Sequence, residues 1–288
     1  MAQSPSSSIS LRVDHASVCG ADLDTMRQDF ARVGLTADYG GPHANGVTHM
    51  ALLGFEDGSY LELIAPQKPG VVEGSGWSTL MAGNAGPCAW AVGTNDIKQE
   101  IERLKGLGIA VSEAKPGSRK RPDGMAVEWM TADVGSSTPG ATLPFIIQDR
   151  TPHNWRVQPS PSIKDSGLVG IDAVVLAVND LDKSAALFQR AYGWPPPVTE
   201  DHFDFDAKLA WFPGQPVILA MPRNGRSWLV DRLHKFGETP IGYVLGTQNF
   251  DKAAKRFHIS YHITWFGQKF AWFDSKKLHG ARIAIWGD

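Results

Sequence analysis

The stretch Leu11–Pro66, LRVDHASVCGADLDTMRQDFARVGLTADYGGPHANGVTHMALLGFEDGSYLELIAP, decides the fold. Leu11–Cys19 alternates between two faces, which is typical of a half-buried strand. Apolar residues then recur at helical spacing up to Gly34, where a helix can end. Two further strands, Val47–Phe55 and Ser59–Ala65, are predicted on either side of a tight turn. The stretch therefore forms one strand–helix–hairpin unit.

A two-residue turn at Asp57-Gly58 would set the register of this hairpin. With that turn Leu53 pairs with Glu62, and the period of two puts His49 on the same face as Glu62. Glu62 stands in an otherwise apolar strand, where a buried carboxylate needs a cation, a partner or a proton. The alternative is that Glu62 points to solvent from a half-exposed strand.

The same pattern recurs three more times along the chain. The segments CGADLDTMRQDFARVGL (19–35) and AVNDLDKSAALFQRAYGW (177–194) share a capping residue, a leucine, a phenylalanine and a glycine. The second copy predicts a strand over Leu168–Val178 and a helix over Leu181–Ala191. A segment rich in Pro and Ser separates the copies into pairs. We therefore predict a disordered tail over residues 1–9, an N-terminal domain over 10–150, a linker over 151–167 and a C-terminal domain over 168–288.

Composition and charge exclude several classes of protein. The chain is 42% hydrophobic and 20% charged, as expected of a globular protein, and its net charge of -2 argues against nucleic-acid binding. No apolar run reaches the ~18–20 residues that cross a membrane. Cys19 and Cys88 do not make a disulfide framework and suit a reducing compartment. Because the polar N-terminus does not resemble a signal peptide either, we expect a cytoplasmic protein.

The basic run Arg119-Lys120-Arg121 lies beside proline and glycine residues. We interpret it as a solvated loop, with a lid over an anionic substrate as the alternative.

Five motifs carry a family resemblance: Asp14-His15, Asp22-Leu23-Asp24, Gly40-Gly41-Pro42-His43, Gly46-Val47-Thr48 and Asp57-Gly58-Ser59-Tyr60-Leu61-Glu62-Leu63. With them the chain resembles the vicinal oxygen chelate (VOC) superfamily and, within it, the glyoxalase-like domain family. The resemblance implies an α+β fold in which four βαβββ modules pair into two cupped mixed sheets, of the glyoxalase/bleomycin-resistance/extradiol-dioxygenase type. It is good over Leu11–Pro66, fair over Gly86–Asp149, and only topological beyond Leu168.

The resemblance also implies a metal site. Superfamily members take metal ligands from the first and fourth strands of a module, which implies His15 and Glu62 here. The hairpin register adds His49, and the family places the Gly-rich loop with His43 at the mouth of the cup. One of these two histidines completes a site of two histidines and one carboxylate for Fe, Mn, Zn or Ni, and the other acts as acid or base.

The second module departs from the family pattern. It has no histidine or glutamate near Cys88 or Phe145, so the expected metal site is confined to the N-terminal half. Cys88 is either a soft metal ligand or, as free cysteines usually are, a small buried residue. The C-terminal half is expected to be structural or to shape the substrate site.

The expected function is that of a divalent-metal-dependent enzyme acting on a small oxygen-bearing organic substrate. The metal would stabilise an enolate or oxyanion, and His43 or His49 would transfer a proton, as in a lyase or isomerase. One alternative is an Fe(II) extradiol-type dioxygenase, and another is a non-catalytic small-molecule binding or resistance protein. The only expected partner is the small-molecule substrate, and the chain is expected to be a monomer or a homodimer.

Overall fold

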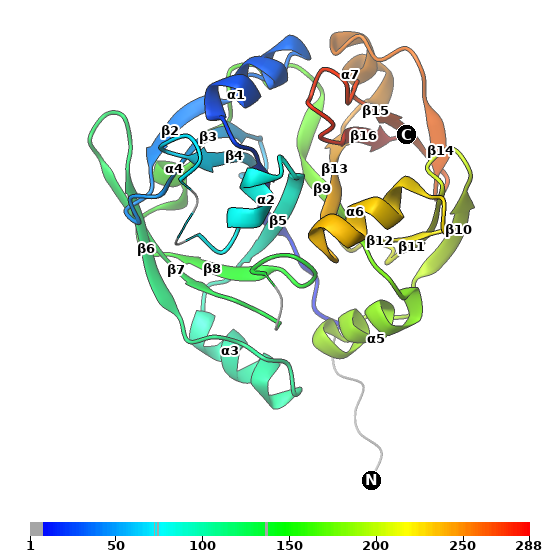
Figure 1. Cartoon of the computed structure of the whole chain (residues 1–288), viewed down its shortest axis with the longest axis horizontal. Helices are drawn as coiled ribbons and strands as arrows, with labels where there is room; N and C mark the ends of the chain where they lie inside the picture. Colours follow the sequence, from blue (N-terminus) through cyan, green and yellow to red (C-terminus); the bar gives the residue numbers. More distant parts are fainter. Residues whose placement is uncertain (1–7, 72, 74, 136–137) are drawn as a thin grey trace.

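Two eight-stranded mixed sheets make up the molecule, and they lie side by side (Figure 1). The computed structural model describes residues 8–71, 73, 75–135 and 138–288, so most of the predicted tail lies outside the described residues. The strand order is β2-β3-β4-β1-β5-β8-β7-β6 in the first sheet and β10-β11-β12-β9-β13-β16-β15-β14 in the second. The same order occurs twice, which confirms the predicted pairing of four βαβββ modules into two cupped mixed sheets.

The first sheet contains every strand from β1 to β8, and three helices accompany these strands. The elements are β1 (Val13–Cys19), α1 (Leu23–Arg32), β2 (Asp38–Pro42), β3 (Thr48–Gly54), β4 (Tyr60–Pro66), α2 (Ser78–Ala82), β5 (Gly86–Gly93), α3 (Ile97–Gly106), β6 (Lys115–Lys120), β7 (Ala126–Ala132) and β8 (Phe145–Asp149).

The short helix α4 (His153–Arg156) follows in the predicted linker, and the division into domains there stays a prediction. The second sheet follows with its own helices. Its elements are β9 (Leu168–Ala177), α5 (Leu181–Tyr192), β10 (Val198–His202), β11 (Ala207–Trp211), β12 (Val217–Pro222), α6 (Trp228–Phe236), β13 (Pro240–Thr247), α7 (Phe250–Arg256), β14 (Ile263–Trp265), β15 (Gln268–Trp272) and β16 (Ile283–Gly287).

One capping device starts the helix of each module. Asp22, Asp96, Asp180 and Asn249 have extended backbones, and each side chain accepts a hydrogen bond from the backbone N–H three residues later. Such a cap satisfies one of the free donors of the first helical turn. The same cap therefore starts the helix that follows the first strand of each module, so the four helices begin at matching positions.

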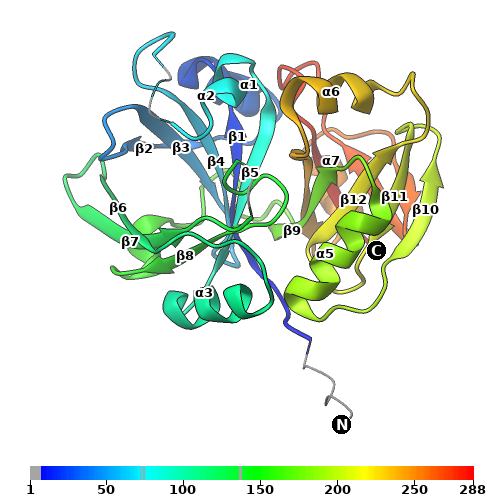
Figure 2. The same cartoon turned by 60° about the horizontal axis from the view of Figure 1, so that its bottom comes forward.

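The inner face of the second sheet is filled by its own side chains. Phe205, Trp265, Phe270 and Trp286 are buried there in one apolar cluster, and α6 adds leucines to it. Figure 2 shows α6 above β12, at the end of the molecule where α1 and α2 of the first half also lie. Large aromatic side chains therefore fill the second sheet, whereas the first sheet has an open cavity.

The two cysteines form a disulfide between neighbouring strands of the first sheet. Cys19 of β1 and Cys88 of β5 are bonded although 69 positions separate them in the sequence. Cys88 is therefore not available as a soft metal ligand. Because such bonds are typical of oxidising compartments, the cysteines no longer support the predicted cytoplasmic location. Within the described ranges, no helix is long and apolar enough to cross a membrane.

Candidate functional site

A cavity of about 870 Å³ opens on the inner face of the first sheet. His15 of β1 lies opposite Tyr60 of β4, and Glu62 follows two residues later on the same side. His43 reaches the cavity from the loop after β2. The structure thus brings together three of the four predicted site residues, His15, His43 and Glu62. The apolar part of the wall is formed by Met50, Leu52, Trp77, Trp129, Phe145 and Ile147.

The predicted register of the β3–β4 hairpin is wrong by one residue. Leu52, rather than Leu53, pairs with Glu62, because a three-residue loop (56–58) replaces the predicted two-residue turn. A slip of one residue moves every side chain of a strand to the other face of the sheet. His49 therefore lies on the face opposite Glu62, where its ring contacts Tyr39. The prediction that His49 and Glu62 share a space is wrong.

Glu62 is an ionised carboxylate inside the cavity. The residue is 5% exposed, Ser17 Oγ donates a hydrogen bond to its Oε2 over 2.9 Å, and His43 Nε2 lies 3.4 Å from its Oε1. Burial by itself would raise the pKa of Glu62. The hydrogen bond and charge of His43, with smaller contributions from His15 and Ser17, outweigh burial and lower this pKa to about 2.

A chain of polar contacts sets the orientation of His43. Its Nδ1 lies 2.8 Å from Thr48 Oγ1, and that oxygen accepts a hydrogen bond from Asn45 Nδ2 over 3.3 Å. Thr48 can then donate its own proton to Nδ1 of His43. In this arrangement the neutral ring carries its proton on Nε2, the nitrogen that faces Glu62.

His15 lines the cavity, and Asp14 and two aromatic rings hold its imidazole. Its Nδ1 lies 2.6 Å from Asp14 Oδ1, and its ring stacks on Tyr60 at 4.8 Å and meets the edge of Phe145 at 5.2 Å. Burial opposes ionisation of Asp14, but the charge of Arg156 and the bonds to His15 and Arg156 lower its pKa. An ionised Asp14 only accepts hydrogen bonds, so Nδ1 of His15 donates, and in the neutral form of the ring the lone pair is on Nε2.

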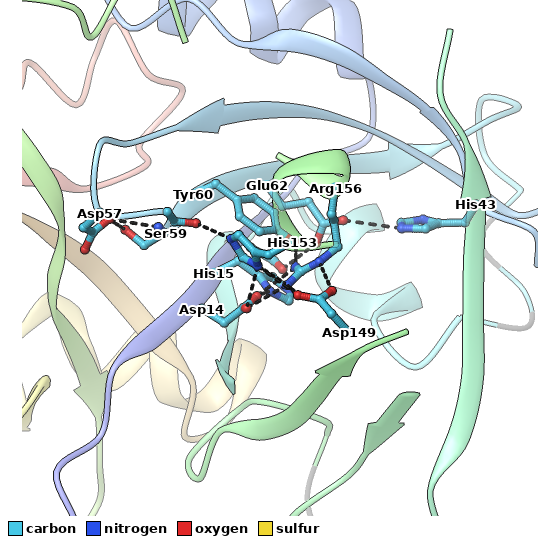
Figure 3. A network of polar contacts seen from close by, with 12 residues as sticks. Asp14, His15, His43, Asp57, Ser59, Tyr60, Glu62, Asp149, His153 and Arg156 are labelled. Atoms are coloured by element: carbon cyan, nitrogen blue, oxygen red, sulfur yellow. Dashed lines mark hydrogen bonds and ion pairs between the residues drawn. The ribbon is translucent and has the colours of Figure 1, made fainter. Parts of the chain in front are cut away.

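Arg156 of α4 is the buried centre of the polar network beside this site (Figure 3). Its guanidinium donates to both oxygens of Asp14 over 2.9 and 2.7 Å, to both oxygens of Asp149 over 2.7 and 3.1 Å, and to Tyr60 Oη over 2.6 Å. These bonds use all five N–H donors of an arginine. His153 completes the network, and its bonds to Asp149 and to the Gly58 carbonyl raise its pKa despite partial burial.

Comparison with known proteins supports the expected family. The sequence matches the family described as Glyoxalase-like domain over residues 13–194, more than half of the chain. The chain belongs to this family. A search of curated protein sequences found no match.

Solved structures show the same fold as this glyoxalase-like protein. A hypothetical protein from Staphylococcus aureus is 14% identical, with a TM-score of 0.61 over 96% of this chain and 98% of that chain. A mutant of 4-hydroxymandelate synthase from Streptomyces coelicolor is 12% identical, with a TM-score of 0.63 over 96% of this chain and 92% of that chain. Methylmalonyl-CoA epimerase from Mycobacterium tuberculosis is 19% identical and covers 42% of this chain and 88% of its own, with a TM-score of 0.37. The first two likenesses, with TM-scores of 0.61 and 0.63, show that this glyoxalase-like protein shares its fold with those chains.

One group of acidic and histidine side chains has the spacing of a metal site. Ligand atoms of Asp14, Asp149 and His153 all lie within 4.8 Å of one another. Arg156, however, already binds both carboxylates with its charged guanidinium, and His153 contacts an acceptor through each ring nitrogen. The positive charges of this network therefore already balance the two carboxylates. A divalent ion would have to displace Arg156, so this group fits a metal poorly.

The cavity holds a second set of donors, to which no described arginine binds, although His15, His43 and Glu62 do not all have ligand atoms within 4.8 Å of one another. His15 has a lone pair on Nε2 and a carboxylate behind Nδ1, which is the usual arrangement of a metal-binding histidine. Glu62 supplies an ionised oxygen, and His43 Nε2 is the nitrogen within reach of that oxygen. In the second module, the apolar Ala91 of β5 pairs with Phe145 of β8, and Phe145 and Ile147 line the cavity.

Sequence reasoning missed the residues that support the site. Arg156 lies in the segment that we interpreted as a linker, and no local pattern marks it. The predicted solvated loop at 119–121 is also wrong in part, because Arg119 belongs to β6 and is 4% exposed. Its guanidinium donates to the backbone carbonyls of Gly40 and Arg156, so it holds the cavity wall together instead of forming a lid.

Proposed function

We propose that this chain is a metal-dependent VOC-superfamily enzyme of the lyase or isomerase type. Its substrate is a small organic molecule with two neighbouring oxygens, bound in the cavity of the first sheet. His15 and Glu62 hold a divalent ion, and His43 is the residue that transfers a proton. The observation that carries the proposal is the buried Glu62, whose pKa is lowered, in one cavity with His15, whose Nδ1 is held by Asp14.

The charge state of Glu62 supports a site that binds a cation. An ionised carboxylate within a largely apolar cavity is unfavourable unless donors or a cation compensate it. Ser17 and His43 compensate part of this charge, and among the described residues Oε1 of Glu62 has only the long 3.4 Å contact with His43. The imidazole nitrogen of His15 and a carboxylate oxygen of Glu62 are donors that suit Fe, Mn, Zn or Ni, and they leave positions for substrate oxygens.

Each residue of the site has a separate role in the proposed reaction. A bound ion supplies Lewis-acid stabilisation of an enolate or oxyanion. In the tautomer whose Nδ1–H donates to Thr48 Oγ1, Nε2 of His43 has a lone pair and would accept the proton of the substrate carbon, and it would return this proton to the neighbouring atom in an isomerisation. Thr48 holds Nδ1 of His43 during this transfer. Trp77, Trp129 and Phe145 exclude water from the reacting carbon.

Metal analysis of the purified protein and of three variants tests the proposal. We expect about one divalent ion per chain in the wild type, and loss of this ion in His15→Ala and Glu62→Gln. His49→Ala is the matched control, because His49 lies on the other face of the same sheet and should keep the ion. If the wild type binds no stoichiometric ion after incubation with Fe, Mn, Zn and Ni, the proposal is wrong.

The same measurement separates two other candidate functions. Iron as the bound ion, with consumption of dioxygen on addition of a catechol, would replace the lyase or isomerase by an extradiol-type dioxygenase. A non-catalytic binding protein is a second candidate because aromatic side chains cover much of the cavity wall. For that function, an aromatic ligand should bind Glu62→Gln as tightly as the wild type without any metal.

A further inference from the structure

The ladder between β1 and β5 is interrupted directly beneath the site. Ser17 pairs with Ala89 and Val18 pairs with Pro87, so Cys88 is an extra residue in β5. A bulge of this kind leaves backbone groups without partners in the ladder. Cys88 is fully buried, so a free N–H there would be costly unless another group accepts its hydrogen bond.

Tyr243 of the second sheet supplies the missing partner. Its Oη accepts a hydrogen bond from the Cys88 N–H over 3.1 Å and lies 2.6 Å from the Ser17 carbonyl and 2.8 Å from the Ala89 carbonyl. The single hydroxyl proton is donated to these two oxygens. Burial raises the pKa of Tyr243, so the hydroxyl stays protonated and remains a donor. A side chain from β13 thus completes a strand pair of the other half.

Ser17 connects this bulge to the site. Its carbonyl binds Tyr243 on one side, and its hydroxyl donates to Glu62 Oε2 over 2.9 Å on the other. Ser17 and Glu62 are also direct neighbours in the parallel pairing of β1 and β4. A shift of Ser17 would therefore move the donor that holds Glu62.

We propose that Tyr243 is a positioning residue for Glu62, acting through the backbone and the hydroxyl of Ser17. The C-terminal half, whose own cup is filled, would then serve the site by holding the bulge under it. This inference rests on the proposed role of Glu62 as a metal ligand. It goes beyond that role because it assigns a specific task to the half of the chain without ligands.

Two tyrosine variants of the full chain provide the test. Tyr243→Phe removes one hydroxyl and keeps the ring. Tyr192→Phe is the matched control. Tyr192 is a buried tyrosine of the same half, and its hydroxyl has no hydrogen bond to the described residues. The probe is Mn(II) alone, with its dissociation constant measured by titration calorimetry. The second readout is the hydrogen-exchange rate of the Cys88 amide. Both readouts are repeated with Ser17→Ala and with the Ser17→Ala/Tyr243→Phe double variant.

We expect Tyr243→Phe to weaken Mn(II) binding about tenfold, in line with the loss of other supporting contacts of metal ligands. We also expect at least tenfold faster exchange at Cys88, and neither change in Tyr192→Phe. The effects of Ser17→Ala and Tyr243→Phe on binding should be less than additive, because both act on the same contact to Glu62. Unchanged Mn(II) affinity, or fully additive effects, would overturn the inference.

The outcomes also separate this inference from the proposed function. If the wild type binds no Mn(II) or other divalent ion, the proposed function fails, and the inference is judged by exchange at Cys88 and by the coupling of the two variants in unfolding experiments. If Tyr243→Phe does not fold, exchange in the wild type decides: Cys88 should be as protected as its neighbours in β5. Fast exchange at Cys88 in the wild type would contradict the proposed bond.

Discussion

Replacement of Arg156 by methionine should destabilise the fold strongly. Methionine keeps the unbranched apolar stem of the side chain, but it lacks the guanidinium and donates no hydrogen bond. The change leaves the carboxylates of Asp14 and Asp149 and the hydroxyl of Tyr60 without the five bonds described above. Removing one partner of a buried ion pair typically costs about 3–5 kcal/mol. We expect a loss of this size in the free energy of unfolding at pH 7.

The pH dependence of stability gives a second signature. Arg156 lowers the folded-state pKa of Asp14 below its unfolded value of 3.8. A lowered pKa stabilises the fold above the unfolded value, and this contribution is lost as the pH falls through the folded value. The wild type should therefore lose stability below about pH 4, and Arg156→Met should lose less there, because its Asp14 is no longer held in the ionised form.

Urea unfolding followed by circular dichroism, at pH 7 and at two acidic pH values, measures both effects. Arg150→Met is the matched control, because Arg150 lines the same cavity but is exposed. A destabilisation below about 1 kcal/mol, the usual value of exposed ion pairs, would refute the reasoning. So would stabilisation of the wild type by a divalent ion that Asp149→Asn abolishes, since this would show a metal in place of the guanidinium.

Three further predictions concern stability. Cys19→Ser opens the bond to Cys88 across 69 positions, and urea unfolding should show a loss of about 4 kcal/mol; a loss below about 1 kcal/mol would mean that the bond does not form in solution. Gly170→Ala puts a methyl group 2.1 Å from the Asp57 carboxylate, so its melting temperature should fall, and an unchanged value would contradict the close contact between the halves. The pKa of His153 is raised, so its stabilisation is present below the unfolded value of 6.5 and is lost as the pH rises through the folded value. His153→Ala should therefore be more destabilising at pH 6 than at pH 9, and equal losses would argue against a charged His153.

Local patterns in the sequence predicted the elements well. The strand predicted over Leu168–Val178 is β9, Leu168–Ala177, and the helix predicted over Leu181–Ala191 is α5, Leu181–Tyr192. Apolar spacing and the Asp180 cap act over neighbouring residues, so one sequence carries this information. The same reasoning placed His15, His43 and Glu62 in elements that the fold brings to one cavity.

The register and the supporting network depend on information that the local sequence lacks. The residues Glu56-Asp57-Gly58-Ser59 suit both a two-residue turn and a three-residue loop with glycine at its end, and only the loop is formed. This difference of one residue moved His49 to the wrong face. Arg156 binds Asp14 across 142 positions, so neither residue could be assigned its partner before the fold was known.

The tryptophans that fill the cup of the second sheet should give a constant fluorescence signal, against which binding in the cavity can be measured. Of the ten tryptophans in the chain, only Trp77 and Trp129 line the cavity. Trp211, Trp228, Trp265, Trp272 and Trp286 belong to the aromatic cluster of the other half. A molecule that enters the cavity should therefore quench a small part of the emission against a constant background. Comparison of the wild type with Trp129→Phe would isolate that part, so occupancy of the cavity can be followed before any substrate has been identified.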